Sequence, residues 1–209
     1  MSSQRAVAIV AAAGRALGAS ARRAGYVPLI ADYFGDQDTI ALSRVHIRLA
    51  TGLANGMSEW EVLSALDGLA RSAHPTGVVC GSGFEDRPEL LAKIARHWRL
   101  LGNRPEMVAR MKDPVAVAKL CSDCDIPCPD IALVPPPDPA RWLVKRRGGA
   151  GGIHVRQADD CAPCDGASYF QRRVEGTPVS ALVLGDGRRA VVLGLSSQWS
   201  SPTAGSCNG

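Results

Sequence analysis

The chain has 209 residues, of which 46% are hydrophobic, 21% are charged and 5% are aromatic. This composition is that of a soluble globular protein, and the length allows one large domain or two small ones. The formal net charge is only +4, and the Lys and Arg residues are scattered along the chain. Nucleic-acid-binding domains concentrate more basic charge on one face, so we expect no nucleic-acid partner.

The apolar and cysteine content bears on the cellular compartment. No stretch approaches the ~18 consecutive apolar residues of a membrane span, so we expect no membrane association. The cysteines number seven, which is odd, and Cys80 and Cys121 lie in apolar stretches. These features argue against a disulfide framework and favour a reducing cytoplasm.

The N-terminal residues alternate between apolar strands and helices. Ala6–Ala13 is apolar without alternation, which is typical of a strand buried on both faces. Arg15–Ala24 is rich in small residues and predicts a helix that ends at Gly25, and Val27–Ala31 predicts a second buried strand. A strand–helix–strand unit predicts a parallel sheet and therefore an α/β, Rossmann-like fold.

The next elements extend this domain. Helical periodicity predicts a helix over Glu59–Ala73, and Thr76–Cys80 predicts a third strand. Pro88 stands at the first position of a further helix, which we expect to run to about Leu101. The apolar side of the first of these helices is predicted to carry Trp60, Leu63, Leu66 and Leu69.

A glycine-containing loop follows the third predicted strand. Open α/β sheets bind ligands at the carboxyl ends of their strands, so we predict a substrate site in this loop. Glu85 or Asp86 would face a substrate amine, although a turn before a helix explains the same acids. The candidate substrate-binding residues are Gly81, Ser82, Gly83 and Glu85.

The first strand–helix turn leaves a competing interpretation open, that of an NAD(P)-binding oxidoreductase. Asp32 ends the second strand, where dinucleotide-binding folds carry an acid for the ribose. However, the turn Ala12–Gly18 lacks the G-x-G-x-x-G triplet, and Arg15 lies where the backbone would approach pyrophosphate. The spacing therefore argues against dinucleotide binding at this turn, while Asp32 leaves the interpretation open.

The second half combines a helix with several short strands. Pro114 is expected to begin a helix that ends near Cys124, and Ile131–Val134 predicts a strand before a proline-rich spacer. Ser168–Val174 predicts another strand. Two apolar runs joined by Gly-Asp-Gly predict a β-hairpin over Val179–Leu184 and Arg188–Leu195.

The densest cluster of glycines lies between these strands. An apolar run that begins at Trp142 ends in the cations Lys145, Arg146 and Arg147, and four glycines follow within five residues, Gly148, Gly149, Gly151 and Gly152. Such glycines let backbone N–H groups point at one bound anion without obstruction from Cβ atoms. The loop therefore predicts a polyphosphate site, although a solvated charged hairpin has the same composition.

In their order along the chain, these motifs resemble the ATP-grasp superfamily. The resemblance rests on Lys112, on Ile126-Pro127-x-Pro129 after a helix, on Lys145 with its glycine loop, and on Tyr169–Gly176 before the hairpin. It implies a pre-ATP-grasp, Rossmann-like domain over residues 1–110, a lid and nucleotide-binding subdomain over 111–196, and an irregular tail over 197–209.

Within the superfamily, the chain is similar to the tyramine–glutamate ligase branch of carboxylate–amine ligases. This branch shares Glu175-Gly176-x-x-x-Ser180 and Asp186-Gly187. The stretches Asp32–Asp36 and Gly81–Pro88 are similar to ATP-grasp proteins linked to methanopterin- and methanofuran-type one-carbon metabolism. The resemblance implies an ATP-dependent ligase that activates a carboxylate as an acyl phosphate for attack by an amine, in the biosynthesis of a one-carbon-carrying cofactor. A homodimer is also expected from the family.

The resemblance implies roles for individual residues. Lys145 would bind the α- or β-phosphate of ATP, Lys112 matches a second phosphate-binding lysine, and the loop Gly148–Gly152 would close over the phosphates as a lid. Glu175 is the nearest acid for the ribose hydroxyls. The hinge that reads adenine is matched by Gln171, Arg172, Arg173 and Val174.

The superfamily holds its Mg²⁺ ions on acidic residues and an asparagine that follow the hairpin. Here Asp186 is the last acidic residue, and the chain ends at Gly209. The resemblance therefore implies a C-terminally truncated ATP-grasp chain whose magnesium ligands lie outside it.

The cysteines leave a third interpretation open, that of a non-catalytic zinc- or nucleotide-binding module. Cys121-x-x-Cys124-x-x-x-Cys128 and Cys161-x-x-Cys164 contain paired Cys-x-x-Cys units. Structural zinc sites usually separate such units by ~15–20 residues, and here the gap spans the proline spacer and the glycine loop. The spacing therefore favours incidental cysteines over a zinc site.

Overall fold

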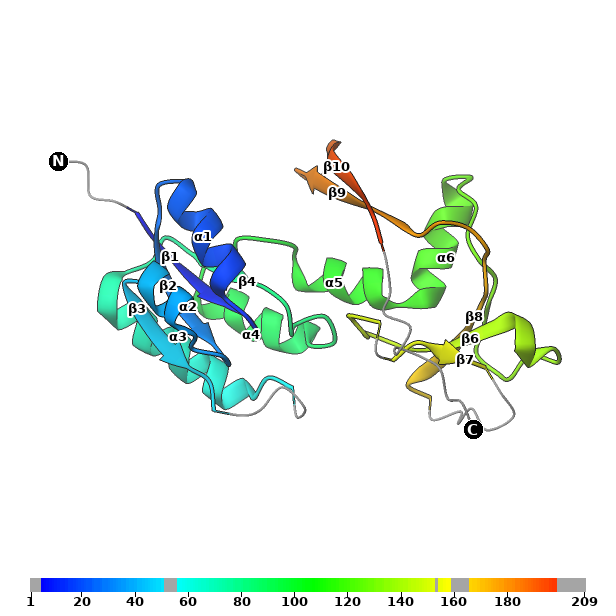
Figure 1. Ribbon diagram of the computed structural model, residues 1–209, viewed down its shortest axis with the longest axis horizontal. Coiled ribbons are helices and arrows are strands. Elements are labelled where there is room, and N and C mark those ends of the chain that lie inside the picture. The colour runs from blue at the N-terminus through cyan, green and yellow to red at the C-terminus, as the bar shows by residue number, and fades with distance from the viewer. Residues whose placement is uncertain (1–4, 51–55, 153, 159–165, 199–209) are drawn as a thin grey trace. The chain divides into compact units, whose positions relative to one another are not determined.

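The computed structural model describes residues 5–50, 56–152, 154–158 and 166–198 (Figure 1). The chain divides into two compact units, Met1–Asp113 and Pro114–Gly209. Among the described residues, no helix combines the length and the apolarity that crossing a bilayer requires.

The first unit is built on a parallel sheet of four strands. The strand order is β3-β2-β1-β4, and each neighbouring pair is parallel. This arrangement confirms the prediction of an α/β fold with a parallel sheet. The strands are β1 (Ala6–Val10), β2 (Val27–Asp32), β3 (Val45–Arg48) and β4 (Val78–Cys80). The helices are α1 (Arg15–Arg23), α2 (Gln37–Leu42), α3 (Glu59–Ala73), α4 (Pro88–His97) and α5 (Pro105–Lys112).

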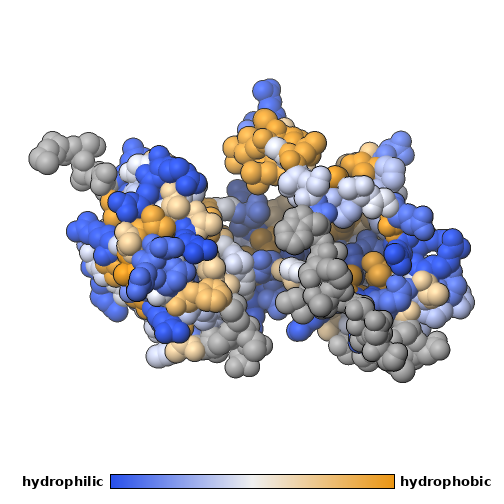
Figure 2. All heavy atoms as spheres, viewed as in Figure 1, coloured by the Kyte–Doolittle hydropathy of each residue, from blue (hydrophilic) through white to orange (hydrophobic). Residues whose placement is uncertain are grey.

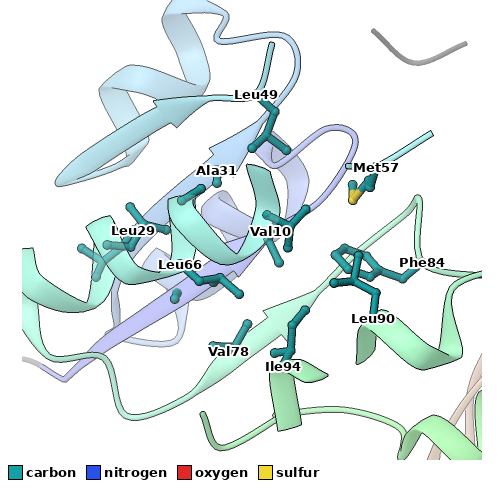
Figure 3. Packing of buried hydrophobic residues seen from close by; sticks show 14 of the residues in the cluster. Val10, Leu29, Ala31, Leu49, Met57, Leu66, Val78, Phe84, Leu90 and Ile94 are labelled. Carbon is teal, nitrogen blue, oxygen red and sulfur yellow. The ribbon is translucent and has the colours of Figure 1, made fainter. Parts of the chain in front are cut away.

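Both faces of this sheet are covered, which explains why β1 is apolar without alternation. On one face, Val7, Ile9 and Ile30 pack against Leu17 and Ala21 of α1. On the other face, a larger cluster joins the sheet to α3 and α4 (Figure 3). Its members in β1, β2, α3, β4 and α4 include Val10, Leu29, Ala31, Leu66, Val78, Leu90 and Ile94.

Helix α1 approaches the sheet closely because it carries glycine where it crosses β2. A Cβ atom at Gly14 would lie 2.4 Å from Cγ2 of Ile30, and a Cβ atom at Gly18 would lie 2.6 Å from Cδ1 of the same side chain. Real Cβ atoms essentially never approach so closely. The glycines of this turn therefore serve packing of the helix on the sheet.

Helix α3 has the predicted bounds, but its buried face is rotated from the predicted one. Trp60 is 77% exposed, which contradicts its placement in the core, while Val62, Ala65, Leu66 and Leu69 are buried. The reason is that Glu59, Trp60 and Glu61 form the first turn of α3, before Val62, which is the first residue of the helix that is buried in the core. Periodicity predicts a face only to within about one residue at a helix end.

This difference gives a direct test. We expect Leu66→Ala to lower the free energy of unfolding of the first unit by about 2–5 kcal/mol, because it leaves a cavity in the core. Trp60→Ala is expected to change it by less than about 0.5 kcal/mol, as for exposed positions generally. Urea unfolding curves of the two variants measure both values, and a larger loss for Trp60→Ala would contradict the observed orientation of α3.

Three elements of the first unit were not predicted, namely α2, β3 and α5. Helix α2 has six residues and β3 has four, so neither fills the window over which periodicity is informative. Local signals exist nevertheless. The Asp36 carboxylate caps α2 by accepting a hydrogen bond from the Thr39 N–H at 2.8 Å, and Pro105 begins α5.

The second unit contains a helix, a small antiparallel sheet and a hairpin. The sheet has the order β5-β8-β6-β7, and its buried side is formed by Trp142, Val144, Ala158 and Phe170. Its pairs are all antiparallel. The elements are α6 (Pro114–Asp123), β5 (Ile131–Ala132), a 3-10 turn (Pro139–Arg141), β6 (Trp142–Arg146), β7 (Arg156–Gln157), β8 (Ser168–Arg172), β9 (Val179–Gly185) and β10 (Ala190–Ser197).

The predicted hairpin is confirmed, with β9 and β10 antiparallel and a bulge between Val192 and Gly194. Its large apolar side chains are between 52% and 76% exposed and alternate onto both faces. Figure 2 shows apolar residues gathered over these strands. They are Val179, Leu182, Val183, Leu184, Val191, Val192, Leu193 and Leu195. Strands that are apolar on both faces are typical of sheets covered on both sides.

Candidate nucleotide-binding site

The antiparallel pairing of β6 and β8 separates an apolar face from a polar face. Val144 lies opposite Phe170, and both side chains point to the small core. Side chains alternate along a strand, so Lys145 and its partner Tyr169 point to the other face. The register therefore gives this pair of strands one face that packs on the core and one polar face.

Lys145 and Gln171 meet on the polar face although they are 26 residues apart in the chain. The Nζ atom of Lys145 donates a hydrogen bond to Oε1 of Gln171. The lysine side chain is half-buried, and burial lowers the pKa of its ammonium group. A cation that has lost part of its hydration interacts more strongly with an anion than one in bulk water.

A cleft of about 1040 Å³ lies within the second unit, beside the glycine loop and the segment after β8. Ligand-binding pockets commonly measure ~300–1,000 Å³, so the cleft has room for a nucleotide. Leu143, which is on the Lys145 face of β6, is part of its wall. The other lining residues are Gly151, Gly152, Val155, Arg173, Val174, Glu175, Gly176, Thr177, Pro178, Ser197 and Gln198.

Five of the residues that the family resemblance singled out for ATP line this cleft. They are Gly151, Gly152, Arg173, Val174 and Glu175. Arg172, which was also singled out, points to the opposite face: it lies opposite Trp142 and pairs with Asp130 at 3.4 Å. The two arginines thus alternate as a strand requires, and only Arg173 reaches the cleft.

The glycine loop has a backbone that other residues rarely adopt. Gly148, Gly151 and Gly152 have φ angles of 72°, 72° and 80°. At Gly149 an added Cβ atom would lie 2.4 Å from Nε2 of His154, so this glycine is needed for the packing of the loop on itself. His154 thus has a packing role in the loop.

Arg147 enters the loop with an unsatisfied donor. Its Nε atom is buried and has no hydrogen-bond partner within the part of the chain that the structure describes. An unpaired buried N–H of a charged group is costly, and a bound anion would satisfy it. The loop therefore combines glycines, the cation of Lys145 and a free donor of Arg147.

Lys112 is the last residue of α5 and lies in the first unit, whereas Lys145 lies in the second. Glu175 is exposed at the rim of the cleft. Asp186 lies in the turn between β9 and β10. Its carboxylate accepts hydrogen bonds from the N–H groups of Arg189 and Arg188, and these bonds lower its pKa.

No metal-binding cluster is evident in the described ranges. They contain no group of three or more His, Cys, Asp or Glu side chains placed to hold a metal ion. Cys161 and Cys164, the second half of the possible zinc motif, lie outside the described residues. The zinc interpretation gains no support from the residues that are described.

The predicted substrate loop forms one side of a smaller cavity of about 180 Å³ in the first unit. Gly81 and Glu85 line it, whereas Ser82 and Gly83 do not. One carboxylate oxygen of Glu85 accepts the Gly83 N–H at 2.7 Å. The remaining walls are mostly apolar and consist of Cys80, Phe84, Leu91, Leu100, Gly102, Asn103 and Val108. Burial raises the pKa of the Cys80 thiol to about 12.

Asp32 has a structural role that removes it from consideration as a ribose ligand. Its side chain is fully buried. One carboxylate oxygen accepts the Gly14 N–H at 2.8 Å, and the other accepts the Gly35 N–H and contacts Nε2 of His46, both at 3.0 Å. The carboxylate therefore ties together the loops after β1 and β2 and strand β3, and it has no exposed oxygen for a dinucleotide.

Comparison with protein families finds a match for part of the chain. The model of the ATP-grasp domain family matches residues 112–205. No match was found among curated proteins.

Several solved structures have a similar fold. N5-carboxyaminoimidazole synthetase from Staphylococcus aureus, complexed with ADP, has 14% identity and a TM-score of 0.64 over 94% of this chain and 55% of that one. Biotin carboxylase from Campylobacter jejuni, in a β,γ-ATP complex, has 15% identity and a TM-score of 0.66 over 91% and 50%. L-amino acid ligase from Bacillus licheniformis has 16% identity and a TM-score of 0.66 over 95% and 52%.

The chain thus spans about half the length of the solved structures that it matches. At this level of identity the likeness concerns the fold, and the fold agrees with the prediction from the sequence. The chain has an ATP-grasp fold, in which residues 112–205 match the ATP-grasp domain family and follow a parallel α/β unit.

Proposed function

We propose that the protein acts as an ATP-dependent ligase and binds ATP in the cleft of the second unit. The observation that carries this proposal is the pairing of Lys145 with Gln171 on the polar face of β6 and β8. The same face of β6 carries Leu143, which lines a cleft together with Gly151, Gly152 and the segment Arg173–Gly176. Structural neighbours that bind ADP and ATP support the choice of ligand.

The residue types suit phosphoryl transfer. In such reactions the protein mainly positions the phosphates and neutralises their charge. Lys145, the amides of Gly148, Gly151 and Gly152 and the unpaired Nε–H of Arg147 would supply positive charge and donors for the phosphates. The segment after β8 supplies backbone groups for adenine, and Glu175 lies at the rim for the ribose hydroxyls.

The reaction that we propose transfers the γ-phosphoryl group of ATP to a carboxylate, and an amine then displaces phosphate from the acyl phosphate. Magnesium would neutralise the phosphates during this transfer. Asp130 pairs with Arg172, and Asp186 accepts N–H groups of its own turn, so we do not propose these two acids as magnesium ligands.

The small cavity beside Glu85 is the proposed site of the amine. The Glu85 carboxylate would pair with an ammonium group, and the apolar walls of the cavity would hold a short hydrocarbon part. We further propose that the ligase works in the cytoplasm in the synthesis of a one-carbon-carrying cofactor. This finer assignment rests on the sequence likeness to the tyramine–glutamate ligase and methanopterin-type proteins.

A thermal shift experiment tests the proposed nucleotide site. ATP and ADP are expected to raise the melting temperature, and at a ligand concentration 100 times Kd the stabilisation is about 2.7 kcal/mol. NAD(P)H is expected to have no effect, because Asp32 is unavailable and the glycine triplet is missing. Stabilisation by NAD(P)H without any effect of ATP would overturn the proposal.

A further inference from the structure

The end of α6 reverses the chain in a way that the nucleotide site does not use. The N–H of Ile126 bonds to the carbonyl of Cys121 at 2.8 Å, and the N–H of Asp125 bonds to the carbonyl of Ser122 at 3.2 Å. Asp125 has a left-handed φ of 54°. These bonds and this φ angle define a Schellman motif, with Asp125 at the position where glycine is usual.

The motif folds the chain back along the last turn of the helix. The following residues Pro127 and Cys128 therefore return toward Cys121, and the Cys128 side chain lies close enough to that of Cys121 for the neighbouring thiol to raise its pKa. Both thiols are partly exposed, whereas Cys124 is exposed at the helix end. The structure thus brings together two cysteines that are seven positions apart, as a consequence of backbone hydrogen bonds.

We propose that Cys121 and Cys128 are a redox modification site, at which a small-molecule disulfide such as oxidised glutathione converts the two thiols into an intramolecular disulfide. The Cys121 thiolate attacks one sulfur of the small disulfide and releases one thiolate. Cys128 then loses its proton and attacks Cys121 in the mixed disulfide, which releases the second thiolate. Two cysteine thiols are oxidised and one small disulfide is reduced to two thiols.

The crosslink would connect the end of α6 to the segment that leads into β5. In the pairing of β5 with β8, Ile131 lies opposite Gln171, which is the hydrogen-bond partner of Lys145. The disulfide would therefore constrain a strand next to the candidate site. Burial and the neighbouring Cys121 thiol raise the pKa of the Cys128 thiol, which keeps it protonated at neutral pH. Oxidation should therefore accelerate as the pH rises and the thiolate fraction increases.

The experiment uses the full chain with Cys124→Ser, so that one tryptic peptide, residues 120–141, retains Cys121 and Cys128 alone. The protein is equilibrated in glutathione redox buffers of increasing oxidised fraction, quenched with acid, alkylated with N-ethylmaleimide and digested. We expect the peptide to lose two hydrogen atoms, to carry no alkyl group, and to regain two alkylation sites after reduction with dithiothreitol.

The matched control is Cys128→Ser, which retains Cys121 and Cys124 in the same peptide. We expect no intrapeptide disulfide in this variant under the same buffers. The proposal is overturned if both thiols of the Cys124→Ser variant are alkylated in every buffer. It is equally overturned if the control forms its disulfide as readily, if Cys121 or Cys128 crosslinks to another peptide instead, or if the oxidation rate does not increase toward alkaline pH.

Discussion

Replacement of Lys145 by alanine is expected to weaken ATP binding by about 10- to 150-fold, measured by isothermal titration calorimetry. A hydrogen bond to a charged group contributes about 1.5–3 kcal/mol, and each 1.4 kcal/mol corresponds to a tenfold change in Kd. The half-buried ammonium of Lys145 lies on the polar face of β6, next to a wall of the cleft. The phosphates would lose their best-placed cation, so ADP binding should weaken as well.

Arg146→Ala is the matched control, because it removes the same charge one residue away. Arg146 is exposed and points to the face opposite Lys145. We expect its replacement to change Kd by less than about threefold, since exposed charges are screened by solvent. Equal losses in the two variants would indicate a general effect of net charge. Undiminished ATP binding by Lys145→Ala would show that the glycine loop is not the phosphate site.

Replacement of Asp32 by alanine is expected to destabilise the first unit by about 3–5 kcal/mol. The change removes the acceptor of the Gly14 and Gly35 N–H groups and the partner of His46. Each buried donor left without a partner costs about 1–3 kcal/mol. Hydrogen–deuterium exchange of peptides from β1 and β2, measured as a function of urea, gives the loss for this unit separately from the second.

Asp38→Ala provides the control for Asp32. Asp38 is in the same region, but its ion pair with Arg15 is long at 3.5 Å and exposed. We expect a change below about 0.5 kcal/mol. Asp32→Asn should lie between the two, because the amide keeps the volume but offers only one acceptor atom. A loss for Asp32→Ala no larger than for Asp38→Ala would show that the buried carboxylate does not hold the loops together.

Most long elements could be predicted because their signal is local. Strand β1 and helix α3 were located from uninterrupted apolar residues and from helical periodicity. The hairpin was located from two apolar runs around a Gly-Asp-Gly turn. Elements of four to six residues, such as α2 and β3, offer too few positions for such patterns, and their stability comes from neighbours that are distant in the chain.

The candidate site was predictable in composition but not in arrangement. The sequence indicates that Lys145 precedes a glycine loop and that Arg172 and Arg173 alternate. It does not indicate the register of β6 against β8, which decides that Lys145 meets Gln171 and that Arg173 rather than Arg172 reaches the cleft. A shift of one residue in this register would exchange the two faces of a strand, and the burial of Trp142, Val144 and Phe170 on one face opposes it.

By itself, the sequence determined the α/β class of the first unit, the hairpin and the resemblance to the ATP-grasp superfamily, since each depends on residues that are close together in the chain. The tertiary structure decided that Trp60 is exposed, that the Asp32 carboxylate is engaged in three hydrogen bonds, and that Cys128 lies near Cys121. These outcomes depend on which distant groups meet, and contacts between distant groups are selected by the packing of the whole unit rather than by local propensity.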